Sequence, residues 1–268
     1  MEPFHYEVLQ NVPLMMIRPW VEESSVLTAG ISAGKHYSLH RKQDTPQDVV
    51  PEREKLAQAL GFSFDAWTNA VQVHGTEIVR VTRAERGAGN RTHETAIPET
   101  DGLITDEADI LLTAFYADCV PLLFWDPVHD AVGVAHAGWR GTVLGIAREM
   151  VERMNREFST DPEAIRVAIG PSIGACCYEV DDRVVGALHK QMPSPSAGVV
   201  QPKANGRYQL DLKRANADIL KEAGVCDKHV CVTNYCTSCE RRLFFSHRRD
   251  GELAGRMVAW IGKRKDDA

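Results

Sequence analysis

Short runs of β-branched and aromatic residues recur along this chain, and stretches with helical periodicity stand between several of them. Such runs bury themselves by pairing as strands, and amphipathic helices cover the resulting sheets. The runs predict strands over residues 70–73, 77–82, 120–125, 131–136, 166–169 and 229–233. The periodic stretches predict helices over residues 52–60, 142–158 and 182–192, and a further helix from a cap at Asp211 to a stop at Gly224.

The fold class that follows is α+β, with mixed β-sheets covered by helices. A chain of 268 residues buries a substantial core, and no linker divides it, so we expect one domain spanning residues 1–268. The polar stretch at 83–100 is expected to be a poorly ordered surface insertion. The charged residues at 263–267 are expected to form a solvated tail.

Three residues that bind soft or borderline metals stand at the ends of strand-like runs. They are His74 in Val-Gln-Val-His-Gly, Cys119 in Ala-Asp-Cys-Val-Pro and His136 in Ala-His-Ala-Gly-Trp-Arg-Gly. Taken singly, such residues are more often inert core thiols or satisfied imidazoles. Taken together, two imidazoles and a thiolate without a fourth ligand form the donor set of a catalytic zinc site. We therefore expect Zn²⁺ at these three residues, with copper as the alternative.

The same motifs resemble the YfiH-like family, also called the laccase-domain or polyphenol oxidase family. The resemblance extends to Ile-Gly-Pro-Ser-Ile-Gly-Ala-Cys-Cys-Tyr-Glu-Val at residues 169–180 and Phe-Phe-Ser-His-Arg-Arg-Asp-Gly at residues 244–251. It implies a layered α/β/β/α arrangement, with zinc on the matching His74, Cys119 and His136. It also implies a purine nucleoside phosphorylase for adenosine, inosine or methylthioadenosine, with adenosine deamination as a side activity.

The N-terminal segment departs from the family pattern. Residues 28–34 read Thr-Ala-Gly-Ile-Ser-Ala-Gly where the family has Gly-Gly-Val-Ser-x-Gly, and His40 replaces an asparagine. These differences bear on substrate preference and leave the three metal residues untouched.

Deamination and phosphorolysis place different demands on the site. Deamination needs a metal-activated water and a carboxylate that moves protons. Asp118, beside Cys119, is the candidate, and orienting a histidine is its alternative role. Phosphorolysis needs an anion site, for which Arg140 at a helix start is the candidate and Arg248 with Arg249 a second option. The predicted catalytic residues are therefore Cys119, Asp118 and Arg140.

Two other functions remain open at this point. A Cys119 nucleophile with His136 as its base would make the chain an amidase that edits peptidoglycan precursors. A polyphenol oxidase would use copper. Multicopper laccases draw many of their ligands from His-x-His pairs, however, and none of the ten histidines here has that spacing.

The other cysteines give a weaker signal. Cys236 and Cys239 form a Cys-x-x-Cys pair, and Cys226 and Cys231 precede them with wider spacing. Structural zinc usually takes two tight pairs, so this set is only a weak match to a second metal site. The adjacent cysteines at 176–177 are expected to be packed thiols.

Charge and composition limit the partners. The formal charge of −6 leaves no basic footprint for nucleic acid, and no apolar stretch is long enough to cross a bilayer. The first residues lack the regions of a secretory signal, and seven cysteines in such a chain favour reduced thiols. We expect a cytoplasmic enzyme whose partners are purine nucleosides and phosphate, with the oligomeric state left open.

Overall fold

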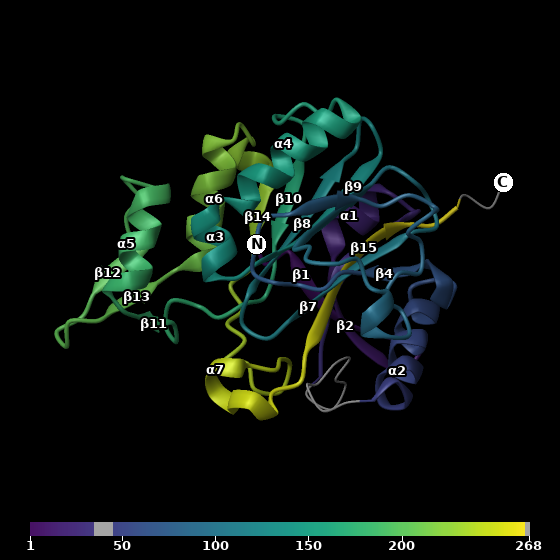
Figure 1. The fold of residues 1–268 in the computed structure, drawn as a ribbon, viewed down its shortest axis with the longest axis horizontal. Coiled ribbons are helices and arrows are strands. Elements are labelled where there is room, and N and C mark those ends of the chain that lie inside the picture. The colour runs from purple at the N-terminus through teal and green to yellow at the C-terminus, as the bar shows by residue number, and fades with distance from the viewer. Residues whose placement is uncertain (35–44, 266–268) are drawn as a thin grey trace.

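Two mixed β-sheets packed face to face form the centre of the computed structural model, which describes residues 1–34 and 45–265 (Figure 1). The first sheet has the order β1 (Phe4–Leu9), β2 (Val12–Ile17), β3 (Leu27–Ser32), β15 (Met257–Lys263), β7 (Leu111–Tyr116), β4 (Trp67–Asn69). The second has the order β14 (Val230–Val232), β10 (Arg166–Ile169), β8 (Val120–Asp126), β9 (Ala131–Ala137), β6 (Gly102–Thr105), β5 (Ile78–Arg80). Parallel pairs stand among the antiparallel ones in both sheets, which confirms the predicted mixed sheets.

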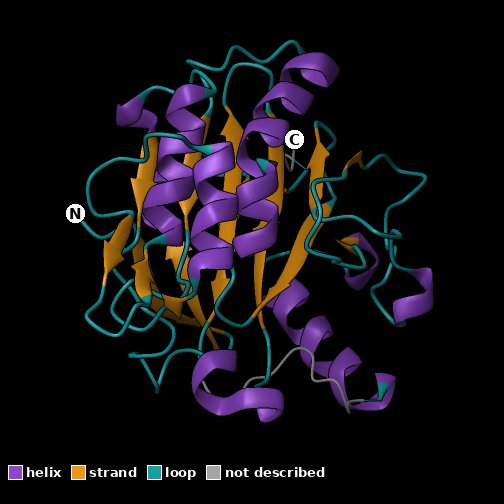
Figure 2. Ribbon diagram, turned by 60° about the vertical axis from the view of Figure 1, so that its left-hand side comes forward, coloured by secondary structure: helices purple, strands orange, loops and turns teal. Residues whose placement is uncertain are grey.

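Helices cover the outer faces of these sheets, and Figure 2 shows several of them packed side by side in front of a layer of strands. The helices are α1 (Arg18–Glu23), α2 (Pro46–Ala59), α3 (Trp139–Leu144), α4 (Ile146–Phe158), α5 (Asp182–Gln191), α6 (Leu212–Glu222) and α7 (His247–Asp250). None of the described helices combines the length and the apolar character needed to cross a membrane. A small antiparallel sheet of β11 (Glu179–Val180), β13 (Tyr208–Leu210) and β12 (Val200–Pro202) lies beside α5 at one end of the molecule (Figure 1).

Side-chain alternation along the central strands builds the layers. Leu122 and Phe124 of β8 pack in the core beneath α4 and α6, while Leu123 and Trp125 face the first sheet. On the far side of that sheet, Trp260 of β15 packs with residues of α2. The order is therefore helix, sheet, sheet, helix, which confirms the predicted α/β/β/α arrangement.

Several predicted element boundaries need correction. Residues 70–73 form no strand, since β4 ends at Asn69 and Ala70 makes only a single bridge to Ile97. The helix predicted over 142–158 begins at Trp139 and is split at Gly145, whose φ of +87° is a left-handed conformation that ends α3.

Caps explain the beginnings of two further helices. The predicted start of α2 at residue 52 is wrong, because the helix begins six residues earlier behind a capping box in which Asp48 accepts from the backbone N–H of Thr45. The predicted cap at Asp211 is confirmed, since its carboxylate accepts from the backbone N–H of Arg214. The predicted strands after residue 76 are found with ends that move by at most two residues.

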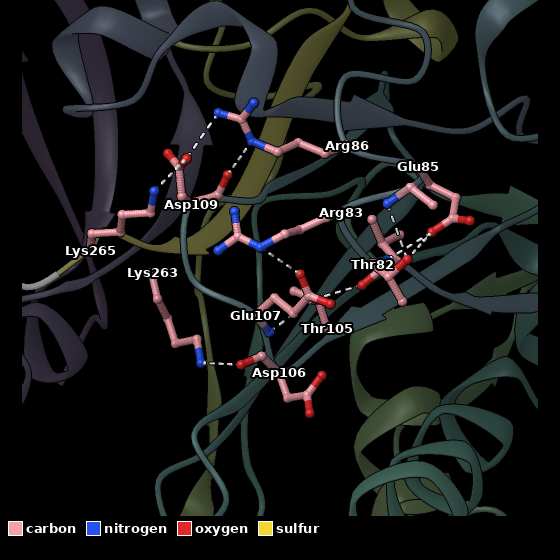
Figure 3. Close-up of polar contacts among 12 residues, drawn as sticks. Thr82, Arg83, Glu85, Arg86, Thr105, Asp106, Glu107, Asp109, Lys263 and Lys265 are labelled. Carbon is pink, nitrogen blue, oxygen red and sulfur yellow. Dashed lines mark hydrogen bonds and ion pairs between the residues drawn. The ribbon is translucent and has the colours of Figure 1, made fainter.

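The segment at 83–100 is not the loose insertion that its composition predicts. Arg86 donates to the backbone carbonyl of Asp109 at 2.8 Å and to its carboxylate at 3.0 Å (Figure 3). Farther along, Ile97 is buried and bridges to Ala70. These contacts tie the segment to the connection between β6 and β7 and to the chain just after β4. Part of the segment forms a wall of the site described below.

The predicted solvated tail is wrong at its first residue. Lys263 ends β15 with only 2% of its side chain exposed, and its Nζ donates to the carbonyl of Asp106 at 2.9 Å (Figure 3). The same Nζ donates to the carboxylate of Asp130 at 2.8 Å. A buried ammonium needs such partners. Residues 266–267 of the tail and His40 of the N-terminal segment lie outside the described residues.

Candidate metal centre

The imidazoles of His74 and His136 and the thiol of Cys119 meet beside the ends of β8 and β9, the two central strands of the second sheet. Strands β8 and β9 are antiparallel with Pro121 opposite His136, so the start of β8, preceded by Cys119, lies beside the end of β9. His74 enters from the segment between β4 and β5, and its Nε2 lies 3.9 Å from Cys119 Sγ. One ligand atom from each residue lies within 4.8 Å of the others. The structure therefore brings all three predicted metal residues together.

The carboxylate of Asp101, which is not among the residues predicted for the site, holds two of these residues. It accepts from His136 Nδ1 at 2.8 Å and from the backbone N–H groups of His74 at 3.1 Å and Gly75 at 2.7 Å. A carboxylate on one ring nitrogen fixes a histidine's orientation and leaves the other nitrogen for a metal. Its only signal in the sequence is an acidic residue directly before an apolar run, Gly-Leu-Ile-Thr.

Backbone conformation at the site carries strain. His74 has a φ of +63° and Asp118, next to Cys119, has a φ of +85°, both in the left-handed region that non-glycine residues rarely adopt. Such conformations persist where surrounding contacts hold them, and they concentrate at functional sites. Here the contacts are the hydrogen bonds of the two aspartates, Asp101 and Asp118.

Gly138 lets the backbone pass close to two of the three residues. A Cβ at this position would lie 2.8 Å from Cδ2 of His74 and 3.0 Å from Sγ of Cys119. Any larger residue would push these side chains apart. The glycine of the Ala-His-Ala-Gly motif is therefore required by space beside the candidate ligands.

Cys119 and His136 shift each other's protonation. Burial raises the pKa of the Cys119 thiol, but the charge of His136 and hydrogen bonds from both histidines outweigh it and lower the pKa to about 6. Burial lowers the pKa of His136, but the Cys119 thiolate and the Asp101 carboxylate outweigh it and raise that pKa to about 9. Between these values the metal-free pair is a thiolate beside an imidazolium.

This pairing predicts the pH dependence of alkylation. In metal-free protein, alkylation of Cys119 by iodoacetamide should rise with pH through about 6, because the thiolate is the nucleophile and a lowered pKa populates it above that pH. Mass spectrometry of the Cys119 peptide at a series of pH values measures the midpoint. Cys231, whose pKa burial raises to about 12, should stay unmodified in the same samples. If His136→Ala left the pH midpoint of Cys119 alkylation unchanged, the result would contradict the electrostatic pairing of Cys119 with His136.

Asp101→Asn is expected to weaken metal binding by about 10- to 100-fold, since the carboxylate that orients His136 is gone. Competition with a chromogenic chelator measures the dissociation constant. Asp106→Asn is the matched control, because Asp106 pairs with Arg80 at the protein surface and should bind metal like the parent. An unchanged affinity for Asp101→Asn would remove its positioning role.

A cavity of about 520 Å³ opens beside the three residues, all of which line it. The segment at 83–100 forms part of its wall, through Gly89 and the neighbouring residues 91–94. Arg53 also lines it, and its buried guanidinium lies over the ring of Phe115, 5.0 Å from the ring centroid. A pocket of this size with an aromatic ring and fixed polar groups is suited to a small organic ligand.

Asp118 makes structural contacts to a distant segment. Its carboxylate accepts from the hydroxyls of Thr237 at 2.6 Å and Ser246 at 3.0 Å and from the backbone N–H of Arg248 at 2.6 Å. The carboxylate therefore ties the Cys119 segment to the loop before α7. None of these three partners is a histidine, and the carboxylate that orients His136 is that of Asp101. The contacts of Asp118 favour positioning of the Cys119 segment over proton transfer.

The arginines considered for phosphate lie in different surroundings. Arg140 is exposed at the start of α3 and lines a second hollow of about 270 Å³ that also touches His74 and Cys119. Arg248 donates to the carbonyl of Cys177, and Arg249 donates to carbonyls of residues 237–238. Arg140 is therefore the member of the set that faces open space beside the candidate ligands.

The remaining cysteines are arranged differently from the prediction. The Cys236 and Cys239 pair meets Cys176 and Cys177, with one sulfur from each within 4.8 Å of the others. Cys176 is exposed, so its interpretation as a packed thiol is wrong. The two other cysteines near the pair in sequence, at 226 and 231, are not part of this group.

Comparison with known proteins gives consistent relatives. Residues 26–264 match the family described as multi-copper polyphenol oxidoreductase laccase. Purine nucleoside phosphorylase YlmD of Geobacillus stearothermophilus is 47% identical over 91% of this chain and 87% of its own length. YlmD of Bacillus subtilis, also called a purine nucleoside phosphorylase, is 37% identical over 99% of this chain and 100% of its own.

Solved structures agree with the sequence relatives. The crystal structure of the Bacillus licheniformis hypothetical protein YfiH has a TM-score of 0.90 and 38% identity, and the match covers 98% of this chain and 100% of that one. Membership of a single family thus explains the layers, the strand-end motifs and the closing Phe-Phe-Ser-His-Arg-Arg-Asp-Gly segment. The chain belongs to the multi-copper polyphenol oxidoreductase laccase family, which is the YfiH-like family that its motifs resemble.

Proposed function

We propose that this protein is a zinc-dependent purine nucleoside phosphorylase with adenosine deaminase side activity. The observation that carries the proposal is the three-donor set of His74, Cys119 and His136 on the wall of a 520 Å³ cavity. Relatives that are up to 47% identical are named purine nucleoside phosphorylases. Because phosphate and nucleosides are small molecules, the proposal requires neither a nucleic acid nor a membrane as partner, and it places the enzyme in the cytoplasm, where thiols stay reduced.

The donor set fits zinc. Two imidazoles and one thiolate leave one of the four positions of tetrahedral zinc for a substrate or water, and a bound zinc ion supplies a Lewis acid at the cavity wall. A copper electron-transfer site with the same two histidines and one cysteine usually adds a weak axial methionine. Among the described residues that line the cavity and the second hollow, none is a methionine.

Phosphorolysis requires that a phosphate oxygen bond to C1′ of the ribose while the bond from C1′ to the purine nitrogen breaks. The electron pair of that bond leaves with the base, which takes up a proton, and the products are the free base and ribose 1-phosphate. Arg140 is the proposed phosphate residue, because a guanidinium presents a planar pair of donors to two phosphate oxygens. The proposed role of Asp118 is to keep Cys119 in position through its hydrogen bonds to Thr237 and Ser246.

Product analysis tests the proposal. Purified protein of known zinc content is incubated with adenosine, with and without phosphate, and the products are identified by mass spectrometry. Adenine and ribose 1-phosphate should form only with phosphate, and inosine would show the deaminase activity. Cys119→Ala should abolish product formation while Cys226→Ala, a cysteine outside the site, should not. Turnover that survives Cys119→Ala would reject the proposal.

Arg140→Met is expected to raise KM for phosphate by about 10- to 100-fold, the loss expected for a charged hydrogen-bonding pair. KM for the nucleoside should change little. Arg183→Met is a matched control, because Arg183 is exposed and stacks near the same ring of Trp139, 5.8 Å from its centroid, without lining the hollow. Equal phosphate KM values for both variants would place the anion site elsewhere.

A second candidate is a Cys119–His136 amidase. The pKa of Cys119 is about 6, so at neutral pH its thiolate lies beside the imidazolium of His136. Cysteine hydrolases use this thiolate–imidazolium pair for attack on an acyl carbon. Metal dependence separates the candidates, since a zinc-bound thiolate is a poor nucleophile. Amide hydrolysis of cell-wall peptides that increases when zinc is removed would favour the amidase, and loss of nucleoside turnover on zinc removal favours the phosphorylase.

A further inference from the structure

Four cysteines outside the candidate metal centre converge on one point at the protein surface. Cys176 and Cys177 come from the turn after β10, and Cys236 and Cys239 come from the loop between β14 and α7. The four Sγ atoms all lie within 4.8 Å of one another. Two segments about 60 residues apart thus each contribute a pair of thiols. Structural zinc sites usually have two such tight pairs, and the cysteines at 226–239 alone supply only one.

The sulfur–sulfur distances among Cys176, Cys177 and Cys239 match one face of a tetrahedron of thiolates around zinc, and the sulfur of Cys236 lies within 4.8 Å of all three. The Sγ atom of Cys176 lies 3.8 Å from that of Cys177 and 3.7 Å from that of Cys239. The Sγ atoms of Cys177 and Cys239 are 3.5 Å apart. With Zn–S bonds of about 2.3 Å, the edge of a regular tetrahedron is about 3.8 Å. A disulfide would require about 2.05 Å, so these sulfurs stand at ligand spacing and not at bonding distance.

The backbone around the cluster is shaped for close approach of the sulfurs. The N–H of Gly174 donates to Sγ of Cys236 at 3.2 Å. A Cβ on Gly174 would lie 3.2 Å from Cβ of Cys236 and 3.3 Å from Sγ of Cys176, so the glycine leaves the space that the cluster needs. Hydrogen bonds of this kind stabilise thiolate ligands and orient them.

Cations hold the two loops. Nζ of Lys213, whose side chain is buried, donates to the carbonyls of Thr233 at 2.9 Å and Tyr235 at 2.8 Å, just before Cys236. Arg249 donates to carbonyls of residues 237–238, between the two later cysteines, and Arg248 to the carbonyl of Cys177. Four thiolates around one Zn²⁺ carry a net charge of −2, which neighbouring cations compensate.

We propose that Cys176, Cys177, Cys236 and Cys239 bind a second zinc ion, held by four thiolates as a structural site. Four sulfur ligands close the tetrahedron and leave no position for substrate. The site joins the turn after β10 to the loop that carries Thr237, whose hydroxyl donates to Asp118 beside Cys119. The second zinc therefore supports the segment that places the thiol of the first site.

Zinc content measured in variants that each lack one of the two metal sites tests the proposal. Protein purified under reducing conditions without added chelator should contain two zinc ions per chain by inductively coupled plasma mass spectrometry. The double variant His74→Ala, His136→Ala should keep one, and Cys176→Ser with Cys239→Ser should also keep one. Cys226→Ser is the matched control and should keep two.

X-ray absorption spectroscopy of the His74→Ala, His136→Ala variant gives a readout that needs no change in the cluster itself. The remaining zinc should show four sulfur neighbours at about 2.3 Å. Absence of zinc from this variant, coordination by fewer than four sulfurs, or disulfide bonds among the four cysteines in the intact mass would each overturn the proposal. None of these measurements depends on nucleoside turnover, so the test of the second zinc site is independent of the phosphorylase assay.

Discussion

His74→Ala, Cys119→Ala and His136→Ala are each expected to lower kcat/KM for nucleoside phosphorolysis by about 1000-fold or more. The reason is that each substitution removes one of three ligands, and a Lewis acid contributes several kcal/mol of transition-state stabilisation. The zinc content should fall by one ion per chain in each variant. Steady-state kinetics with adenosine and phosphate, together with metal analysis of the same preparations, measures both effects.

The fold should survive these substitutions, because the three side chains line a cavity beside the ends of strands β8 and β9. Circular dichroism and thermal melting should therefore resemble those of the parent. His189→Ala is the control, since His189 is exposed on α5 and lies in neither metal group. Full activity in a His74→Ala protein that has lost one zinc ion per chain would show that the metal at this centre is not required and would direct attention to the amidase.

Trp260→Ala is expected to lower the free energy of unfolding by about 4 kcal/mol and Tm by roughly 10 °C. Trp260 is fully buried in β15, between the first sheet and α2, and its indole N–H donates to the hydroxyl of Thr28 at 3.1 Å. Truncation leaves a large cavity and an unpaired hydroxyl. Denaturant titration and thermal melting measure the loss.

The position of this tryptophan links stability to the site. Its strand pairs with β7, where Met257 lies opposite Tyr116, and β7 leads directly to Cys119. Val128→Ala is the control, because Val128 is 70% exposed in the turn after β8 and surface truncations change stability by less than about 0.5 kcal/mol. A Trp260→Ala protein that melts within two degrees or so of the parent would show that the outer core contributes far less than burial indicates.

Periodicity predicted the central elements well because they are buried on both faces or clearly amphipathic. Strands such as β8 and β9 are continuous apolar runs, and α4 presents a regular apolar stripe that includes Met150 and Met154. The prediction missed β6, β7 and, at the two ends of the chain, β1, β2, β3 and β15. Some of these, such as β15, are apolar runs as well, but which strand each one pairs with depends on distant segments, as where β3 lies beside β15.

The misread polar stretches have a common physical cause. Residues 83–100 and Lys263 look solvated by composition, but their charged groups find carboxylates and carbonyls on neighbouring elements. A charge is paired or exposed according to what lies next to it. That information is absent from a local window of sequence.

The sequence by itself determined the α+β class, the central strands and the three residues that form the candidate metal centre. These follow from local chemistry, since burial pattern and donor type are properties of short segments. Only the tertiary structure revealed Asp101 as the residue that orients His136 and paired the cysteines at 176–177 with those at 236 and 239. Carboxylate orientation and sulfur convergence depend on distances between segments far apart in the chain, and folding alone sets those distances.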